Sequence, residues 1–285
     1  MNAVLIIFVV IFLTVQNMHT KKYIRKNDGK GPFIYASISA LAAAITFVIL
    51  GGGNLDFTWD TLAYSVGFAL SYSLCNICTF CAIQAGSLAL TSLFTSYSLI
   101  IPSMCAIALF DEPVTKWLII GTGLMLLSLT LVNLPEKGSG LKVSFKWFWF
   151  AFLAFAGNGL CSTVQTIQQR TFDGAYKNEF MIVALLISSA ISAISSIVAE
   201  RGTIIRSIKT GSPLAVANGC INAFVNLFVM MLVMTMNASV VYPLISVGGI
   251  VLTGLVSVLV YKEKLSVKQI AGIVTGAGAI VFLNM

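Results

Sequence analysis

The chain contains one long stretch twice, and this internal repeat limits the folds open to it. Residues 79–133 align without a gap to residues 230–284, at a shift of 151 positions. Each copy consists of an apolar run, a short turn that contains a glutamate, and a second apolar run rich in glycine. Glu112 of the first copy thereby aligns with Glu263 of the second. A repeat of this length predicts a fold built from two related halves.

The composition indicates that the apolar runs lie in a membrane. Of the 285 residues, 58% are hydrophobic and only 9% are charged, and the mean hydropathy is +0.95. A soluble domain carries about 25% charged residues, so this chain cannot cover its surface with water-facing groups. The net charge of +7 does not indicate a nucleic-acid partner, because the basic residues occupy short segments between apolar runs.

Ten apolar runs are predicted to be membrane-spanning helices. They cover residues 3–18, 32–50, 61–83, 87–110, 116–133, 147–168, 180–199, 212–235, 238–260 and 267–284. A polar segment rich in Pro and Gly follows the fifth run and separates the halves. We therefore predict a first five-helix repeat over residues 1–134, and a linker with the second five-helix repeat over 135–285. The first run is followed by its basic residues instead of preceded by them, so it is predicted to be a span and not a signal peptide.

The number of helices per half predicts how the halves are related. The first helices also repeat, because residues 14–16 (Thr-Val-Gln) recur as residues 163–165, at a shift of 149. Five is an odd number, so the second half starts from the opposite face of the membrane. The sequence thus predicts an all-α integral membrane protein with ten transmembrane helices in a 5+5 inverted repeat. Inverted repeats create a binding site at their interface and allow one half to rock against the other.

The basic residues predict the orientation. With the helices placed as above, 14 of the 17 Lys and Arg residues lie on one face and 3 on the other. Basic loops stay in the cytoplasm. We therefore predict a multi-pass protein of the plasma membrane with both termini outside the cell.

The chain resembles the drug/metabolite transporter (DMT) superfamily, in its EamA-type branch. The resemblance covers the whole length and is carried by residues 109–115 (Leu-Phe-Asp-Glu-Pro-Val-Thr), residues 260–266 (Val-Tyr-Lys-Glu-Lys-Leu-Ser) and the Tyr242-Pro243 pair. It implies secondary transport, with an exporter or facilitator of an amino-acid-like metabolite or an amine as the expected activity. Members of this family usually keep both termini in the cytoplasm, opposite to the outcome of the charge count.

Uncharged polar residues inside the spans are the candidates for substrate binding. Asn218, Asn222 and Asn226 are spaced by four and form a stripe on one helix face. An amide in lipid is costly unless it is paired, so such residues should face the interior. They either form hydrogen bonds between helices or hydrogen-bond a neutral or zwitterionic solute. The rings of Tyr72, Tyr97 and Tyr242 are candidates for an aromatic wall, which would also allow cation–π contact with an organic cation. The predicted substrate-binding residues are Gln16, Asn76, Gln84, Tyr97, Asn158, Gln165, Asn222, Asn226 and Tyr242.

The charged and proline residues near helix ends receive structural interpretations. Glu112 and Glu263 are predicted to cap the helices that they precede, or to act in gating. Arg170 ends the first helix of the second half and is expected to extend to the membrane interface, or, if it turns inward, to be a candidate for binding an anionic substrate group. Pro102 and Pro243 are predicted to kink their helices. No Asp or Glu lies well inside a predicted span, which disfavours proton coupling.

Other function classes have less support. The chain has a single histidine and no Gly-x-Ser-x-Gly or Gly-x-x-x-x-Gly-Lys motif, so no enzyme, cofactor or metal site is predicted. Its six cysteines lie in apolar runs, where thiols pack as small apolar groups. The expected partners are a small-molecule substrate and the lipid bilayer, with a homodimer left open. The alternatives to a transporter are a membrane receptor or scaffold, and, with less support, an intramembrane enzyme.

Overall fold

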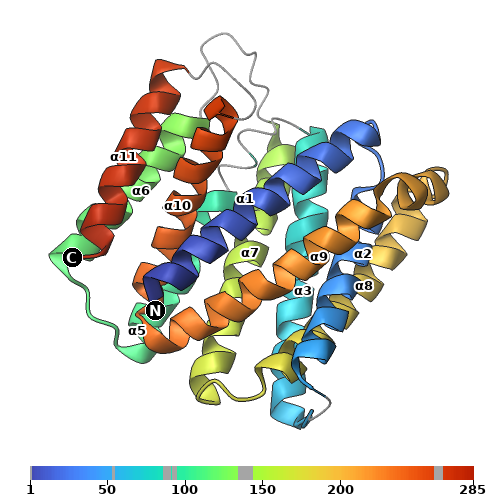
Figure 1. The fold of residues 1–285 in the computed structure, drawn as a ribbon, viewed down its shortest axis with the longest axis horizontal. Coiled ribbons are helices and arrows are strands. Elements are labelled where there is room, and N and C mark those ends of the chain that lie inside the picture. Colours follow the sequence, from blue (N-terminus) through green and yellow to red (C-terminus); the bar gives the residue numbers. More distant parts are fainter. Residues whose placement is uncertain (1, 53–54, 86–90, 92–94, 134–143, 260–265) are drawn as a thin grey trace.

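The computed structural model is all-helical in the part it describes, which is residues 2–52, 55–85, 91, 95–133, 144–259 and 266–285. The helices of this part are α1 (Asn2–Lys26), α2 (Pro32–Leu50), α3 (Trp59–Ala85), α5 (Ile100–Phe110), α6 (Lys116–Asn133), α7 (Phe145–Thr171), α8 (Lys177–Ala199), α9 (Ile204–Thr235), α10 (Ala238–Leu259) and α11 (Val267–Leu283). Figure 1 shows α6 and α11 side by side on one flank, and α2 and α8 together on the other.

Six of these helices are long and apolar enough to cross a membrane. They are α1, α2, α3, α7, α8 and α9. Four shorter apolar helices accompany them, over residues 95–110, 116–132, 238–249 and 267–283. Large apolar side chains such as Ile49, Ile119 and Val198 are exposed on the outer surface. Lipid is the solvent that suits such a surface, so the helices have the pattern of a multi-pass membrane protein.

The helix ends gather at two levels. Short connections reverse the chain between α1 and α2, between α7 and α8 and between α8 and α9. At one level, which we name the basic end, α1, α3 and α8 finish and α2, α7 and α9 begin. Lys30, Lys146, Arg201 and Arg206 lie there. At the opposite end α5, α7 and α9 finish and α10 begins.

Small residues bring the long helices into close contact. A Cβ atom on Gly219 of α9 would lie 2.2 Å from the carbonyl oxygen of Ser39 on α2. Beside this contact, the Ser39 hydroxyl donates to the carbonyl of Ala215 over 2.9 Å. A Cβ atom on Gly157 of α7 would lie 2.8 Å from the backbone of α3 at Cys75. Small residues at membrane helix interfaces allow this approach of backbones.

Three buried glutamates accept backbone hydrogen bonds at, or shortly before, the start of a helix that is distant in the sequence. Glu200 accepts hydrogen bonds from the backbone N–H groups of Phe33 and Ile34 at the start of α2, over 2.9 and 3.1 Å. Glu179 accepts one from Asp56, shortly before α3, over 3.0 Å. A carboxylate at a helix N-terminus satisfies free N–H groups and meets the positive end of the helix dipole.

The third of these glutamates corrects a prediction. Glu112 was expected to cap the helix that follows it, α6. Its carboxylate instead accepts from Ala238 and Ser239 at the start of α10, each over 2.8 Å. The hydroxyl of Thr115 caps α6 by accepting from the N–H of Leu118. The prediction was wrong because sequence proximity does not show which helix start a loop side chain reaches. Glu263 lies outside the described residues.

Several helix limits differ from the predicted spans. Helix α1 continues to Lys26 instead of ending at residue 18, and α9 begins at Ile204 instead of residue 212, because polar and basic residues extend helices beyond their apolar parts. Pro102 lies in the first turn of α5, after an interruption at Ser98 and Leu99. Pro243 lies inside α10.

Candidate functional site

A cavity of about 310 Å³ lies between α1, α2, α3 and α9 near the basic end. It adjoins a wider hollow of about 600 Å³ at that end, and both are lined by Gly29, Lys30, Pro32, Phe80 and Ile83. Its size is that of a small-molecule site, for which cavities of about 300–1,000 Å³ are usual.

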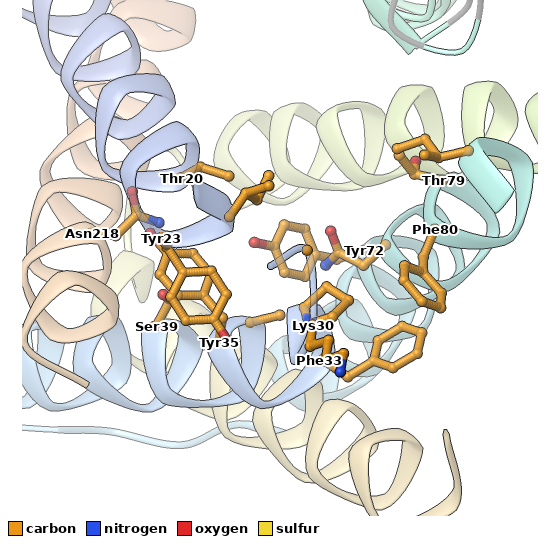
Figure 2. A pocket seen from close by; sticks show the side chains of 16 residues that line it. Thr20, Tyr23, Lys30, Phe33, Tyr35, Ser39, Tyr72, Thr79, Phe80 and Asn218 are labelled. Atoms are coloured by element: carbon orange, nitrogen blue, oxygen red, sulfur yellow. The ribbon is translucent and has the colours of Figure 1, made fainter. Parts of the chain in front are cut away.

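Aromatic side chains form most of the cavity wall. In Figure 2, Tyr72 of α3 faces Tyr23 and Tyr35 across the space. The rings of Tyr23 and Tyr35 pack against each other with centroids 4.3 Å apart. Nearer the basic end, Phe33 and Phe80 meet edge to face at 4.7 Å. These contacts hold the rings in place, so the cavity presents flat apolar surfaces whose shape is already set.

Two asparagines supply polar atoms that have no hydrogen-bond partner among the described residues. Asn76 of α3 and Asn218 of α9 both line the cavity. The Asn218 Oδ1 atom is buried and accepts no hydrogen bond from the described residues. Asn76 Nδ2 is also buried, and although it lies near the Tyr72 hydroxyl it makes no hydrogen bond of normal geometry. A buried polar atom without a partner costs about 1–3 kcal/mol, so these amides suit a ligand that completes their bonding.

The cavity is almost free of charge. Among the described residues that line it, Lys30 is the one that is charged at neutral pH, and it lies exposed at the entrance. No carboxylate belongs to the described lining of this cavity, whereas Glu200 lines the adjoining hollow. Across the described part of the chain, no group of three His, Cys, Asp or Glu side chains is placed to hold a metal ion.

Three of the predicted binding residues form one chain of amides deeper in the protein. Gln165 of α7 donates through Nε2 to Oδ1 of Asn226 on α9, over 3.3 Å. Asn226 Nδ2 in turn donates to Oδ1 of Asn222, one turn earlier, over 3.0 Å. The stripe predicted on this helix is therefore divided in function, because Asn222 and Asn226 bond within the protein whereas Asn218 reaches the cavity.

The remaining predicted residues lie apart from the cavity. Tyr97 donates to the carbonyl of Leu126, and Asn158 donates to the Ser98 hydroxyl over 2.6 Å. The Tyr242 hydroxyl bonds to Thr166 over 2.7 Å. All three connect helices, which is the alternative interpretation of buried polar groups. Gln84 is exposed at the end of α3 and borders the hollows of the basic end.

Gln16 differs from its repeat partner Gln165. Its Nε2 atom is buried and has no hydrogen-bond partner among the described residues. It belongs to α1, but it is not part of the cavity lining. Of the nine predicted binding residues, Asn76 is thus the one that lines the cavity.

An ion pair closes the interior at the opposite end. Arg170 Nη2 lies 2.6 Å from Oε1 of Glu112, and Arg170 Nε donates to the carbonyl of Val233 at the end of α9, over 2.9 Å. The side chain of Arg170 therefore turns inward, because a buried carboxylate and a free helix carbonyl attract its guanidinium. The pair joins α7, α9 and α10.

Most residues that line the cavity were not predicted as binding residues from the sequence. Asn218 was recognised only as part of the amide stripe, and Tyr23, Tyr35 and Thr20 were not selected. Helix spacing could have identified Asn218, but it could not show where along the helix the cavity ends. The α1–α2 connection that brings Lys30 to the entrance carries no motif.

The overall fold has counterparts among solved structures. One crystal structure, described simply as that of a protein, superposes with a TM-score of 0.79 and covers 99% of this chain and 95% of that chain, at 13% sequence identity. Twenty-eight chains of solved structures match the fold. No family model matches the sequence, and no curated protein matches it. At such low identity the likeness establishes the fold alone.

Proposed function

We propose that the protein is a secondary membrane transporter of a small polar organic metabolite, of the drug/metabolite transporter type. The observation that carries this proposal is the cavity between α1, α2, α3 and α9, which is lined by two asparagines that each have a buried polar atom without a partner among the described residues. A scaffold that binds no solute does not require unsatisfied amides inside its helix bundle, whereas a receptor does, so the counterflow assay below separates a receptor from a transporter.

The helix contacts support an inverted repeat of two five-helix halves. In such a repeat, α1 of the first half corresponds to α7 of the second half, and α3 corresponds to α9. The two-fold axis then relates the contact between α1 and α9 to the contact between α7 and α3. Both contacts are extensive. Helices α2 and α8 would be counterparts that pack on each other, as would α6 and α11. This pairing is the pattern expected of two halves related by a two-fold axis in the membrane plane.

A polar route supports transport from the cavity toward the opposite end. Asn218 and Asn226 are separated by eight residues of α9, or about 12 Å at 1.5 Å per residue. Beyond Asn226, the carbonyl of Val233 meets Arg170. We propose that this structure is the state open to the basic end, and that separation of Arg170 from Glu112 opens the other end. With the basic end in the cytoplasm, both termini lie outside and the protein exports or equilibrates a cytosolic solute.

Reconstitution into liposomes tests this function. Vesicles are preloaded with one unlabelled solute class each (amino acids, amines, nucleobases or nucleosides, sugar phosphates), and entry of the same labelled solute is followed as counterflow. Saturable counterflow with at least one class is expected, reduced by the Asn218→Leu substitution. Binding of a solute without any counterflow would indicate a receptor, and chemical conversion of the solute would indicate an enzyme.

A further inference from the structure

The cavity lining restricts the substrate class, an inference that rests on the proposed function. Charge gives the first restriction. The one charged side chain among the described lining residues is Lys30, at the entrance. A ligand that carries a cation would lose its hydration inside without meeting a carboxylate among the described lining residues, and burial of an unpaired charge is very costly. Cation–π attraction to the tyrosine rings is worth about 2 kcal/mol for a desolvated cation, which offsets only part of that cost. A zwitterionic amino acid meets the same difficulty with its ammonium group. The part of the ligand that enters the cavity is therefore uncharged.

The walls give the second restriction. Tyr72 faces the Tyr23–Tyr35 pair across the space, and Phe33 and Phe80 continue the aromatic surface toward the entrance (Figure 2). Aromatic rings stack on planar π-systems and accept many of them, because each has a flat face. A planar ligand fills a space between such rings with little loss of contact, whereas a branched or puckered one does not.

Hydrogen bonding gives the third restriction. Asn218 Oδ1 requires a donor and Asn76 Nδ2 requires an acceptor. The Tyr35 hydroxyl, which also lines the cavity, likewise makes no hydrogen bond of normal geometry in the described structure. A ligand that satisfies both amides must carry a donor and an acceptor. Asparagine amides pair in this manner with the edges of nitrogen heterocycles, as they do with adenine.

We infer that the cavity binds a neutral planar nitrogen heterocycle, with a free nucleobase or the base of a nucleoside as the ligand class. The ring lies between Tyr72 and the Tyr23–Tyr35 pair. Its N–H group donates to Asn218, and its carbonyl oxygen or ring nitrogen accepts from Asn76. Lys30 remains at the entrance, where it is available to a polar substituent that protrudes from the cavity.

The test is a binding measurement on the purified full-length protein in detergent, by thermal shift and by equilibrium dialysis. The probes are adenine, hypoxanthine and uracil, with phenylalanine, glycine and choline for the competing classes. We expect at least one base to raise the melting temperature in a saturable manner. The Asn76→Leu and Asn218→Leu variants should each bind that base about tenfold more weakly. Asn17→Leu is the matched control, because Asn17 is exposed on α1, and it should bind as the original protein does.

The outcomes separate this inference from the proposed function. A shift by phenylalanine, glycine or choline without a shift by any base would overturn the heterocycle assignment while leaving a transporter. Equal binding of a base by the original protein and both cavity variants would also overturn it. If a leucine variant fails to fold, Asn76→Ala and Asn218→Ala replace it, since alanine is smaller and has no side-chain hydrogen-bonding group. Base binding without counterflow in liposomes would uphold the ligand class and reject transport.

Discussion

Arg170 Nη2 lies 2.6 Å from Oε1 of Glu112, and the same carboxylate accepts hydrogen bonds from Ala238 and Ser239. The Glu112 side chain thus neutralises Arg170 of α7 and also caps the N-terminus of α10. The Glu112 side chain is 2% exposed and that of Arg170 is 22% exposed. Two separable roles in one residue allow a specific test.

Replacement of Glu112 by Gln should lower the free energy of unfolding by about 3 kcal/mol or somewhat less. Loss of one partner of a buried ion pair leaves the other charge uncompensated. The loss is at the low end because the Arg170 side chain is partly exposed to solvent. The measurement is reversible unfolding in a denaturing detergent. Asp111→Asn is the matched control, because Asp111 is adjacent, exposed and in a left-handed conformation that asparagine tolerates. Equal loss in both variants would contradict a specific role for the pair.

Exchange of the two charges should not restore stability. In the double variant Glu112→Arg with Arg170→Glu, the ion pair is conserved in sign but a cation would face the N–H groups at the start of α10. Since helix N-termini favour anions, the double variant should be no more stable than Glu112→Gln in the same assay. Full recovery would show that the ion pair alone matters.

Substitution of Asn218 and of Asn226, two of the three stripe asparagines, should have different effects on stability. Asn226→Leu removes a partner of both Gln165 and Asn222, so it should lower the free energy of unfolding by about 1–3 kcal/mol. Asn218→Leu replaces an unsatisfied amide, so the protein without ligand should be as stable as before or more stable, while it loses binding. Melting temperatures of the two variants, measured side by side, check this. A large loss for Asn218→Leu would show that it bonds within the protein.

Gly219→Ala should destabilise the contact between α2 and α9. The new Cβ atom would lie 2.2 Å from the Ser39 carbonyl oxygen, so the helices must separate, at a cost of about 1–3 kcal/mol. Gly123→Ala on α6 is the matched control, because a Cβ atom there meets nothing within 4 Å. Its melting temperature should be unchanged or higher, since alanine favours helix more than glycine does. Equal destabilisation by both substitutions would show that the loss of glycine itself, and not the close contact with Ser39, lowers the free energy of unfolding.

The orientation is tested by labelling with a membrane-impermeant thiol reagent in intact cells. The native cysteines are first replaced, and a cysteine is introduced at Gly202 of the basic end or at Thr171 of the opposite end. Both positions are exposed. Thr171→Cys should be labelled directly, and Gly202→Cys only after permeabilisation. The reverse pattern would place the basic end outside and the proposed transport direction would invert.

The sequence predicted the architecture better than the site, for physical reasons. Apolar runs identify helices because burial in lipid requires about 20 apolar residues, and most predicted spans overlap the observed helices. Contacts between distant residues leave no local signal, which is why Arg170 was assigned to the interface and Glu112 to the wrong helix. Asn222 and Asn226 were correctly placed on one face with Asn218, but whether an amide bonds to protein or faces a cavity depends on neighbouring helices.

The carboxylates at the starts of α2 and α3 have a consequence for the order in which the chain is completed during synthesis. The Glu200 that caps α2 follows Phe33 by 167 positions, and the Glu179 that bonds before α3 follows Asp56 by 123. These two helices leave the ribosome long before either glutamate exists. The N–H groups of Phe33, Ile34 and Asp56 must be held by water or by the insertion machinery until residues 179 and 200 have been made. Completion of the first half therefore depends on residues of the second half, so a chain that terminates before residue 179 leaves these N–H groups without their carboxylate partners.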